Sequence, residues 1–291
     1  MRRIELLLEH IDIEHQQGLE IGALCNPVVP PECAGISYVD HLDRAGLRQK
    51  YATDPNVDTE RIVPVRYVWT GGPLVDVVGA RRFDYVVASH VIEHVPDLVG
   101  WLRSVAQVLR PAGVLSLAVP DMRYTFDCQR KPTTIAELLE AYLMQYRRPS
   151  IRQVLDHFVH NVDVPGHCSA ASLWADSTLA ARVPRTRPML LKELGEAGVR
   201  KHFDAIQAGE YIDTHCTVVT PESFLGLLTE LAGLDLIGFC VKAFHPTAMN
   251  DHEFIACLEK LPDEIARADR AVRERCILDR MPRPGAQPAC G

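Results

Sequence analysis

Apolar and polar residues recur along the chain with two different periods, and each period indicates one kind of secondary structure. Apolar residues three and four positions apart predict an amphipathic helix over residues 3–15. Short apolar runs that end at glycine, proline or a carboxylate predict strands. These runs cover residues 18–22, 36–40, 61–69, 83–89 and 114–119.

Helical and strand patterns alternate from residue 83 onward. The helical spacing over 97–110 stops at the Pro111-Ala-Gly113 sequence, directly before the strand predicted at 114–119. Further along, Thr220 and Pro221 open a helix, and strands are predicted over 234–244 and 253–258. The nearly continuous apolar run at 83–89 is typical of a buried parallel strand. This alternation predicts an α/β fold with a doubly wound sheet.

The regular alternation is interrupted between about residues 121 and 211. Helical stretches near 134–147 and 150–160 carry many histidines and aromatic residues, and a polar segment follows at 182–188. We interpret this part as a largely helical insertion or lid within a single domain over residues 1–280. The proline-rich residues 281–291 are expected to form a disordered tail.

The composition excludes several classes of protein. With 31 Lys and Arg against 38 Asp and Glu, the formal net charge is −7, so nucleic acid is not an expected partner. Nine scattered cysteines without a C-x-x-C pair favour a reducing compartment, and we expect a cytoplasmic location. The N-terminal sequence does not match a signal peptide, and no apolar run is long enough to span a membrane.

Two predicted strands end in residues that suit an adenosine-containing ligand. The first strand runs into Gly22, and the second ends about 20 residues later at Asp40, whose carboxylate can accept hydrogen bonds from ribose hydroxyls. The turn contains only one of the three glycines of a dinucleotide fingerprint, so it is a poor pyrophosphate site. An adenosyl ligand without phosphate, such as S-adenosylmethionine, fits these residues better.

Four segments together resemble the class I S-adenosylmethionine-dependent methyltransferases in their order and spacing. The segments read Leu19-Glu-Ile-Gly-Ala, Tyr38-Val-Asp, Phe83-Asp-Tyr-Val-Val-Ala-Ser-His-Val-Ile-Glu-His-Val-Pro-Asp and Val108-Leu-Arg-Pro-Ala-Gly-Val-Leu. The resemblance covers residues 15–121 and implies a Rossmann-like fold, with a mostly parallel seven-stranded sheet flanked by helices. It also implies S-adenosylmethionine as the cofactor and methyl transfer as the reaction.

The resemblance assigns residues to the cofactor position by position. It places Glu20 and Gly22 at the methionine end, Asp40 at the ribose and the segment that begins at Trp69 at the adenine. Leu24 and Asn26 stand where many members have glycine. The cofactor residues that the resemblance implies are Glu20, Gly22, Ala23, Asn26, Asp40, Trp69, Ser89 and His90.

The methyl acceptor requires further residues. An oxygen acceptor needs a base, and histidine suits this role because its ordinary pKa is about 6.5. The candidates are Asp121 directly after the fifth strand, His157 and His167 in the insertion, and His215 shortly after the insertion. Glu93 and His94 are assigned to a helix start and the cofactor loop.

A divalent ion such as Mg²⁺ is an alternative that the spacing does not favour. The histidines from 157 to 215, with Asp156, Asp163 and Asp213, offer ligands for an ion that clamps a vicinal diol. No spacing among them matches a compact metal motif, so the sequence assigns no metal ligand.

Two segments narrow the expected substrate. Residues 119–127 and 213–224 are similar to bacterial methyltransferases associated with glycan and polysaccharide building. The leading hypothesis is therefore an O-methyltransferase that acts on a sugar hydroxyl of a saccharide precursor. The alternatives are a small-molecule O- or N-methyltransferase of secondary metabolism and a non-catalytic binding module with the same fold. A homodimer is compatible with the apolar surface that the N-terminal helix and the insertion offer.

Overall fold

A computed structural model describes residues 2–162, 168–184 and 188–262. Three sequence assignments therefore lie outside the described residues: His167 as a base, Asp163 as a metal ligand and 281–291 as a disordered tail. The described chain forms one seven-stranded sheet with the order β3-β2-β1-β4-β5-β7-β6. Its strands are β1 (Gly18–Ile21), β2 (Ile36–Asp40), β3 (Val65–Val68), β4 (Phe83–Ser89), β5 (Leu109–Pro120), β6 (Phe239–His245) and β7 (Glu253–Lys260).

The sheet is mostly parallel, as the sequence predicts. Neighbouring strands from β3 to β5 run parallel, whereas β7 runs antiparallel to both β5 and β6. Because the carboxyl ends of parallel strands meet at one edge, the residues that follow β1, β2, β3, β4 and β5 gather there.

Helices connect the strands and extend beyond the sheet. They are α1 (Arg2–Leu7), α2 (Arg44–Lys50), α3 (Val75–Val78), α4 (Leu98–Val108), α5 (Ile135–Leu143), α6 (Ile151–His160), α8 (Ala170–Ala175), α9 (Pro188–Gln207) and α10 (Pro221–Gly233). Short 3₁₀ turns are η1 (Thr59–Arg61), η2 (Ile92–His94), η3 (Met122–Tyr124) and η4 (Leu179–Arg182).

Local side-chain bonds explain where several of these helices begin. The Asp97 carboxylate caps α4 by accepting a hydrogen bond from the Gly100 amide at 2.8 Å. Thr220 caps α10 and Pro221 occupies its first turn, as the sequence predicts.

The structure corrects two predicted boundaries near the N-terminus. The helix expected over 3–15 ends at Leu7, and a separate turn follows in which the Asp12 carboxylate accepts hydrogen bonds from the amides of Glu14 and His15. The strand expected over 61–69 is shorter and begins at Val65, directly after a proline that has no amide hydrogen to donate.

Two further boundaries differ later in the chain. The helix expected to stop at Pro111 already ends at Val108, because β5 begins at Leu109 and contains the irregular stretch from Arg110 to Gly113. The strand expected over 234–244 starts at Phe239, since Asp235, with a φ of 61°, turns the chain away from the end of α10.

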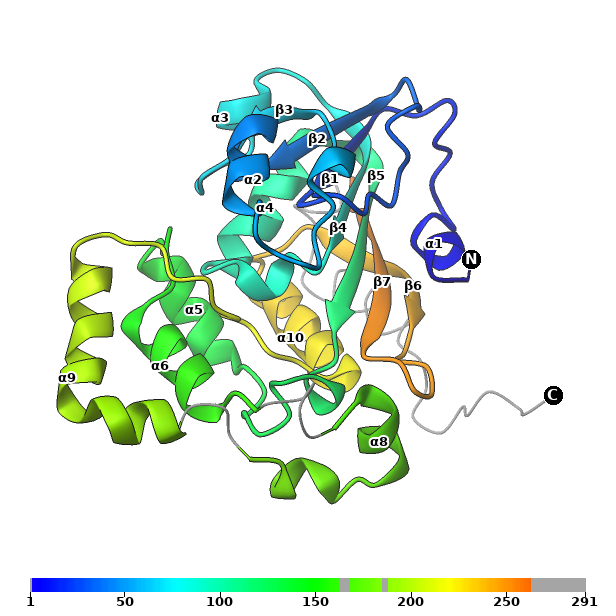
Figure 1. The fold of residues 1–291 in the computed structure, drawn as a ribbon. Helices are drawn as coiled ribbons and strands as arrows, with labels where there is room; N and C mark the ends of the chain where they lie inside the picture. Colours follow the sequence, from blue (N-terminus) through cyan, green and yellow to red (C-terminus); the bar gives the residue numbers. More distant parts are fainter. Residues whose placement is uncertain (1, 163–167, 185–187, 263–291) are drawn as a thin grey trace.

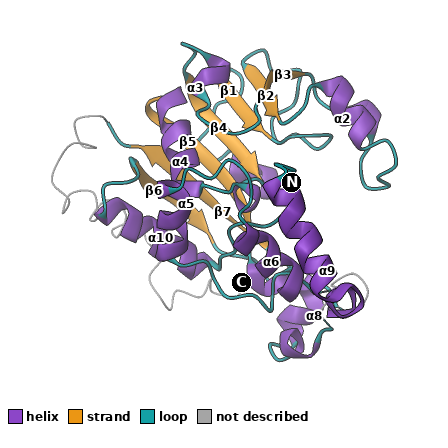
Figure 2. Ribbon diagram, turned by 90° about the vertical axis from the view of Figure 1, so that its left-hand side faces the viewer, coloured by secondary structure: helices purple, strands orange, loops and turns teal. Residues whose placement is uncertain are grey.

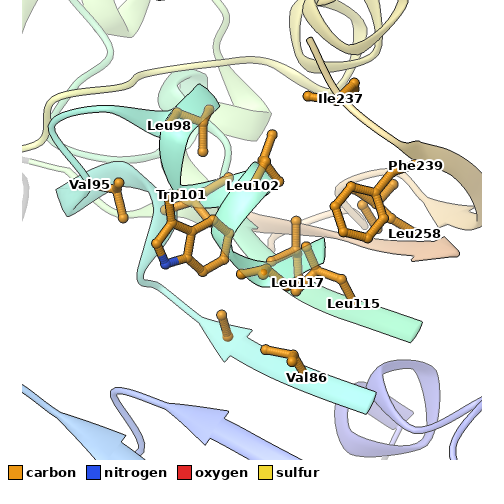
Figure 3. Packing of buried hydrophobic residues seen from close by; sticks show 14 of the residues in the cluster. Val86, Val95, Leu98, Trp101, Leu102, Leu115, Leu117, Ile237, Phe239 and Leu258 are labelled. Carbon is orange, nitrogen blue, oxygen red and sulfur yellow. The ribbon is translucent and has the colours of Figure 1, made fainter. Parts of the chain in front are cut away.

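The two faces of the sheet are covered differently. On one face α4 and α10 pack against the sheet, and Trp101 and Leu102 of α4 lie over Leu115 and Leu117 of β5 (Figure 3). The other face packs against Leu7 of α1 and the loop that follows β1. Side chains alternate between the faces along each strand, so the apolar strand residues form the sheet side of the core, and buried apolar residues of α4 and α10 form the helix side.

The helices α6, α8 and α9 lie beyond the sheet, whereas α5 packs beside α4 and α10. Figure 1 shows α6 and α8 at the end of the molecule toward which β5 points, and Figure 2 shows α6, α8 and α9 grouped together after a quarter turn. None of the helices in the described part of the chain combines the length and apolar character needed to cross a lipid bilayer.

Candidate active site

Backbone hydrogen bonds continue the sheet by one residue past three of its strands. The amide of Gly22 donates to the Val39 carbonyl at 2.9 Å, and that of Trp69 donates to the Asp40 carbonyl at 2.8 Å. The amide of His90 likewise bonds to β5 at 3.0 Å. The residues after β1, β3 and β4 are thereby fixed along one edge, together with Asp40 at the end of β2.

Gly22 occupies a position that favours glycine. Its φ is 72°, a left-handed conformation, and an added Cβ would lie 2.9 Å from a methyl group of Val91. Gly22 is also exposed, so its backbone is accessible to a ligand at this edge. The turn then closes through a 3.0 Å bond from the Asn26 amide to the carbonyl of buried Ala23.

Glu20 stabilises this turn. Its carboxylate is buried, and its two oxygens accept hydrogen bonds from the amides of Val28 at 2.7 Å and Val29 at 2.9 Å. Burial raises the pKa of Glu20 to about 7 although these two bonds oppose the shift. The resemblance places this residue at the cofactor, and the structure shows in addition that its carboxylate holds the loop after β1.

Asp40 and Trp69 are held in place by neighbouring groups. The Oδ1 atom of Asp40 accepts two hydrogen bonds of 2.7 Å from His41, one from its amide and one from its ring Nδ1. The indole of Trp69 is half-buried and donates to the Gly72 carbonyl at 2.9 Å. A carboxylate and an aromatic plane thus stand at adjacent strand ends, an arrangement that fits the ribose and adenine of an adenosyl ligand.

Ser89 and His90 join a charged cluster that reaches the N-terminal helix. His90 bonds to the Glu253 carboxylate at 2.7 Å, and Arg3 bonds to both Glu253 and the Ser89 hydroxyl. Burial raises the pKa of Glu253, but the bonds from His90 and Arg3 outweigh this effect and lower it to about 2. The cluster fixes the end of β4 beside β7.

The three predicted bases that the structure describes, Asp121, His157 and His215, have different surroundings. Asp121 is fully buried, and its carboxylate is engaged by Arg123 at 2.6 Å and by the Thr247 hydroxyl at 2.7 Å. These bonds favour a structural role for Asp121. In contrast, His157 and His215 lie together, with ring centroids 5.8 Å apart.

A buried carboxylate supports His215. Its Nδ1 lies 2.5 Å from Oδ2 of Asp127, and Arg130 bridges Asp127 to Asp156 with bonds of 2.9 and 2.8 Å. The hydrogen bond from His215 and the charges of His215 and Arg130 outweigh burial and lower the pKa of Asp127, which therefore stays ionised.

The structure adds two residues that the sequence assigned only to local structure. Glu93 and His94 form part of η2, directly after β4, and the His94 ring packs edge-on against His215 with centroids 4.7 Å apart. A 2.5 Å bond from the Cys216 amide to the Glu93 carbonyl holds these segments together. The segment Ser89-His-Val-Ile-Glu-His-Val-Pro-Asp97 contains both residues. Their contact partners, His215 and Cys216, lie more than 100 residues further along the chain.

Comparisons with known proteins agree with this geometry. A family profile described as a methyltransferase domain matches residues 23–237, which is more than half of the chain. A search among curated proteins finds no match.

Several solved structures are similar to this chain at low identity. The N-methyltransferase NodS from Bradyrhizobium japonicum WM9 is 13% identical over 90% of this chain and 96% of its own, with a TM-score of 0.39. A methyltransferase from Methanosarcina mazei is 14% identical over 89% of this chain and 98% of its own, with a TM-score of 0.41. The CcbJ methyltransferase from Streptomyces caelestis is 19% identical over 43% of this chain and 53% of its own, with a TM-score of 0.29. This match thus spans about half the length of CcbJ.

The strand order, the residues at the carboxyl edge and the matched profile agree with one another. The chain therefore belongs to the methyltransferase-domain family, that is, to the S-adenosylmethionine-dependent methyltransferases.

Proposed function

We propose that this protein transfers a methyl group from S-adenosylmethionine to a sugar hydroxyl of a saccharide or polysaccharide precursor. The observation that carries the proposal is the buried pair of Asp127 and His215, 2.5 Å apart, beside the turn that follows β4. A hydroxyl acceptor must lose its proton, and an imidazole whose other nitrogen is held by a carboxylate can accept one. In this proposal His215 is the base and Asp127 orients it.

The cofactor contacts in this proposal lie along the edge of the sheet at which the parallel strands end. In the proposal, Asp40 accepts hydrogen bonds from the ribose hydroxyls, and Trp69 lies against the adenine. The exposed backbone at Gly22 allows close approach of the methionine portion, and the loop that Glu20 stabilises forms one wall of the site. Ser89 and His90 border the sulfonium, held by their bonds to Arg3 and Glu253.

Aromatic residues near the acceptor side suit a sugar. Tyr124, in η3 directly after β5, stacks on Trp174 of α8 with ring centroids 4.3 Å apart and planes within 7° of each other. Both rings are half-buried, and the Trp174 Nε1 atom donates to the Asp251 carbonyl at 2.8 Å. A rigid aromatic pair flanked by polar groups provides an apolar surface with hydrogen-bonding edges, as a pyranose ring requires.

The test is methylation with methyl-labelled S-adenosylmethionine and matched panels of saccharides, amines and protein acceptors. We expect label on saccharide hydroxyls, and we expect His215→Gln to lower kcat by about 10²- to 10⁴-fold, the usual contribution of a general base. His15→Gln is the matched control, because His15 also pairs with an aspartate, at 2.9 Å, but lies on an exposed turn. Label on amines or protein alone would refute the proposal, as would full activity of His215→Gln.

A further inference from the structure

Three side chains converge beside η2 with donor atoms that suit a metal ion. One ligand atom from each of Glu93, His94 and His215 lies within 4.8 Å of the other two. Glu93 and His215 are buried, and His94 is partly exposed. The three residues come from two segments that the bond between Cys216 and Glu93 holds together.

The imidazoles of this cluster are oriented by carboxylates. The Nδ1 atom of His94 lies 2.9 Å from Asp213, and the Nδ1 atom of His215 lies 2.5 Å from Asp127. A proton on each Nδ1 leaves the lone pair of each Nε2 available. Metal-binding histidines are commonly held by a carboxylate on the other ring nitrogen in this way.

The Glu93 carboxylate gives an independent indication of a ligand. Glu93 is 3% exposed, and its Oε2 atom has no hydrogen-bond partner among the residues that the structure describes. Its Oε1 atom lies 3.6 Å from His90 Nδ1 and 4.0 Å from His94 Nε2. A buried carboxylate oxygen without a partner is costly, and a bound cation would remove that cost.

We propose that Glu93, His94 and His215 bind a divalent transition-metal ion. Two imidazoles and one carboxylate form a donor set typical of Zn²⁺, Mn²⁺ or Fe²⁺ sites that keep open coordination positions. Metal–ligand distances of about 2.1 Å require the side chains to close by about 1–2 Å when the ion binds. This site differs from the ligands considered in the sequence, since only His215 belonged to that set.

The open positions would bind hydroxyl oxygens of the acceptor. This part of the inference rests on the proposed function and deepens it, because a sugar diol offers two adjacent oxygens to one ion. With the ion bound, His215 would be a ligand rather than the free base of the proposed function. The ion would then make the coordinated hydroxyl more acidic, and its O–H bond would break with the proton passing to water. The oxygen then takes the methyl group from the sulfonium, whose C–S bond breaks as the C–O bond forms.

The direct test measures metal binding without donor or acceptor. The metal-free protein is titrated with Zn²⁺ by calorimetry and with Mn²⁺ by electron paramagnetic resonance. We expect one ion per chain with a dissociation constant below 100 µM. Glu93→Gln and His94→Gln should each weaken binding at least tenfold, whereas His15→Gln should bind as the wild type does. No binding below 1 mM, or equal binding by all variants, overturns the proposal.

A positioning residue provides a second test that does not disturb the buried ligands. The Asp213 side chain is 68% exposed, so Asp213→Asn should leave the fold intact while weakening metal affinity about tenfold through His94. The proposal is overturned if Asp213→Asn, Glu93→Gln and His94→Gln all bind the metal with the affinity of the wild type. Because the metal titration uses no sugar, failure to methylate saccharides would refute only the proposed function. Full methylation of saccharides in the presence of a chelator would refute only the metal inference.

Discussion

Replacing Gly18 by alanine tests the closest packing between β1 and β4. Gly18 pairs with Tyr85 in the parallel ladder, and an alanine Cβ would lie 2.0 Å from Cζ of the tyrosine ring. Ordinary carbon contacts are about 3.5 Å, so the ring must move by about 1.5 Å. Tyr85 is fully buried, and this movement displaces its core neighbours. We expect Gly18→Ala to cost roughly 3 kcal/mol, the upper part of the usual range for overpacking.

The measurement is thermal and urea unfolding of Gly18→Ala beside a control with the same chemical change. The expected loss corresponds to a Tm decrease of roughly 6–12 °C for a domain of this size. Gly226 lies inside α10, where an added Cβ meets no atom within 4 Å, so Gly226→Ala should stabilise the protein by about 0.5–1 kcal/mol.

A double-mutant cycle then tests the cause. Tyr85→Leu removes the ring atoms that the new Cβ would meet, so in this background Gly18→Ala should cost at least about 2 kcal/mol less. An equal cost in both backgrounds, or no loss from Gly18→Ala in the wild type, would refute the reasoning.

Three further predictions concern charged residues around the site. Asp40→Asn should weaken S-adenosylmethionine binding at least about tenfold, because charge-assisted bonds to the ribose are lost; unchanged calorimetric affinity contradicts this. The pKa of Glu20 is raised to about 7, so its contribution to stability is present at low pH and is lost as pH rises through 7. The free energy of unfolding of wild type relative to Glu20→Gln should therefore fall between about pH 5 and 8, and a rise in urea unfolding experiments would disprove it. The pKa of Glu253 is lowered to about 2 by His90 and Arg3, so its contribution is present above about pH 4.5 and is lost as pH falls toward 2. Glu253→Gln should cost about 2 kcal/mol at pH 7 and progressively less in acid, and a difference independent of pH would argue against this ion cluster.

The sequence predicts the strands of the sheet because each apolar run is a local signal. The strand at 83–89 matches β4 residue for residue, since its burial on both faces requires a nearly continuous apolar run. The helix expected over 3–15 was too long for a different reason. Its apolar period continues past Leu7, but the Asp12 carboxylate bonds to two following amides and holds a separate turn, which periodicity alone does not reveal.

The cofactor edge could be predicted better than the acceptor side. Asp40 and Gly22 stand at strand ends that the sequence marks, so their proximity follows from the topology. In contrast, His94 and Asp213 are 119 residues apart, and their 2.9 Å contact depends on how the helices after β5 return to the sheet. Sequence spacing contains no information about that return, which is why Glu93 and His94 were assigned to local structure.

The position of β7 between β5 and β6 also affects how the sheet folds during synthesis. Ser116 of β5 contacts Cys257 of β7, 141 residues later, so during translation β5 pairs with β4 on one side only until β7 has left the ribosome. At about 5–20 residues per second this interval lasts roughly 7–28 s. An apolar strand edge exposed for that time can pair with other nascent chains. Slower synthesis lengthens the exposure, so the yield of native protein should depend on chaperones that cover this edge until β7 arrives.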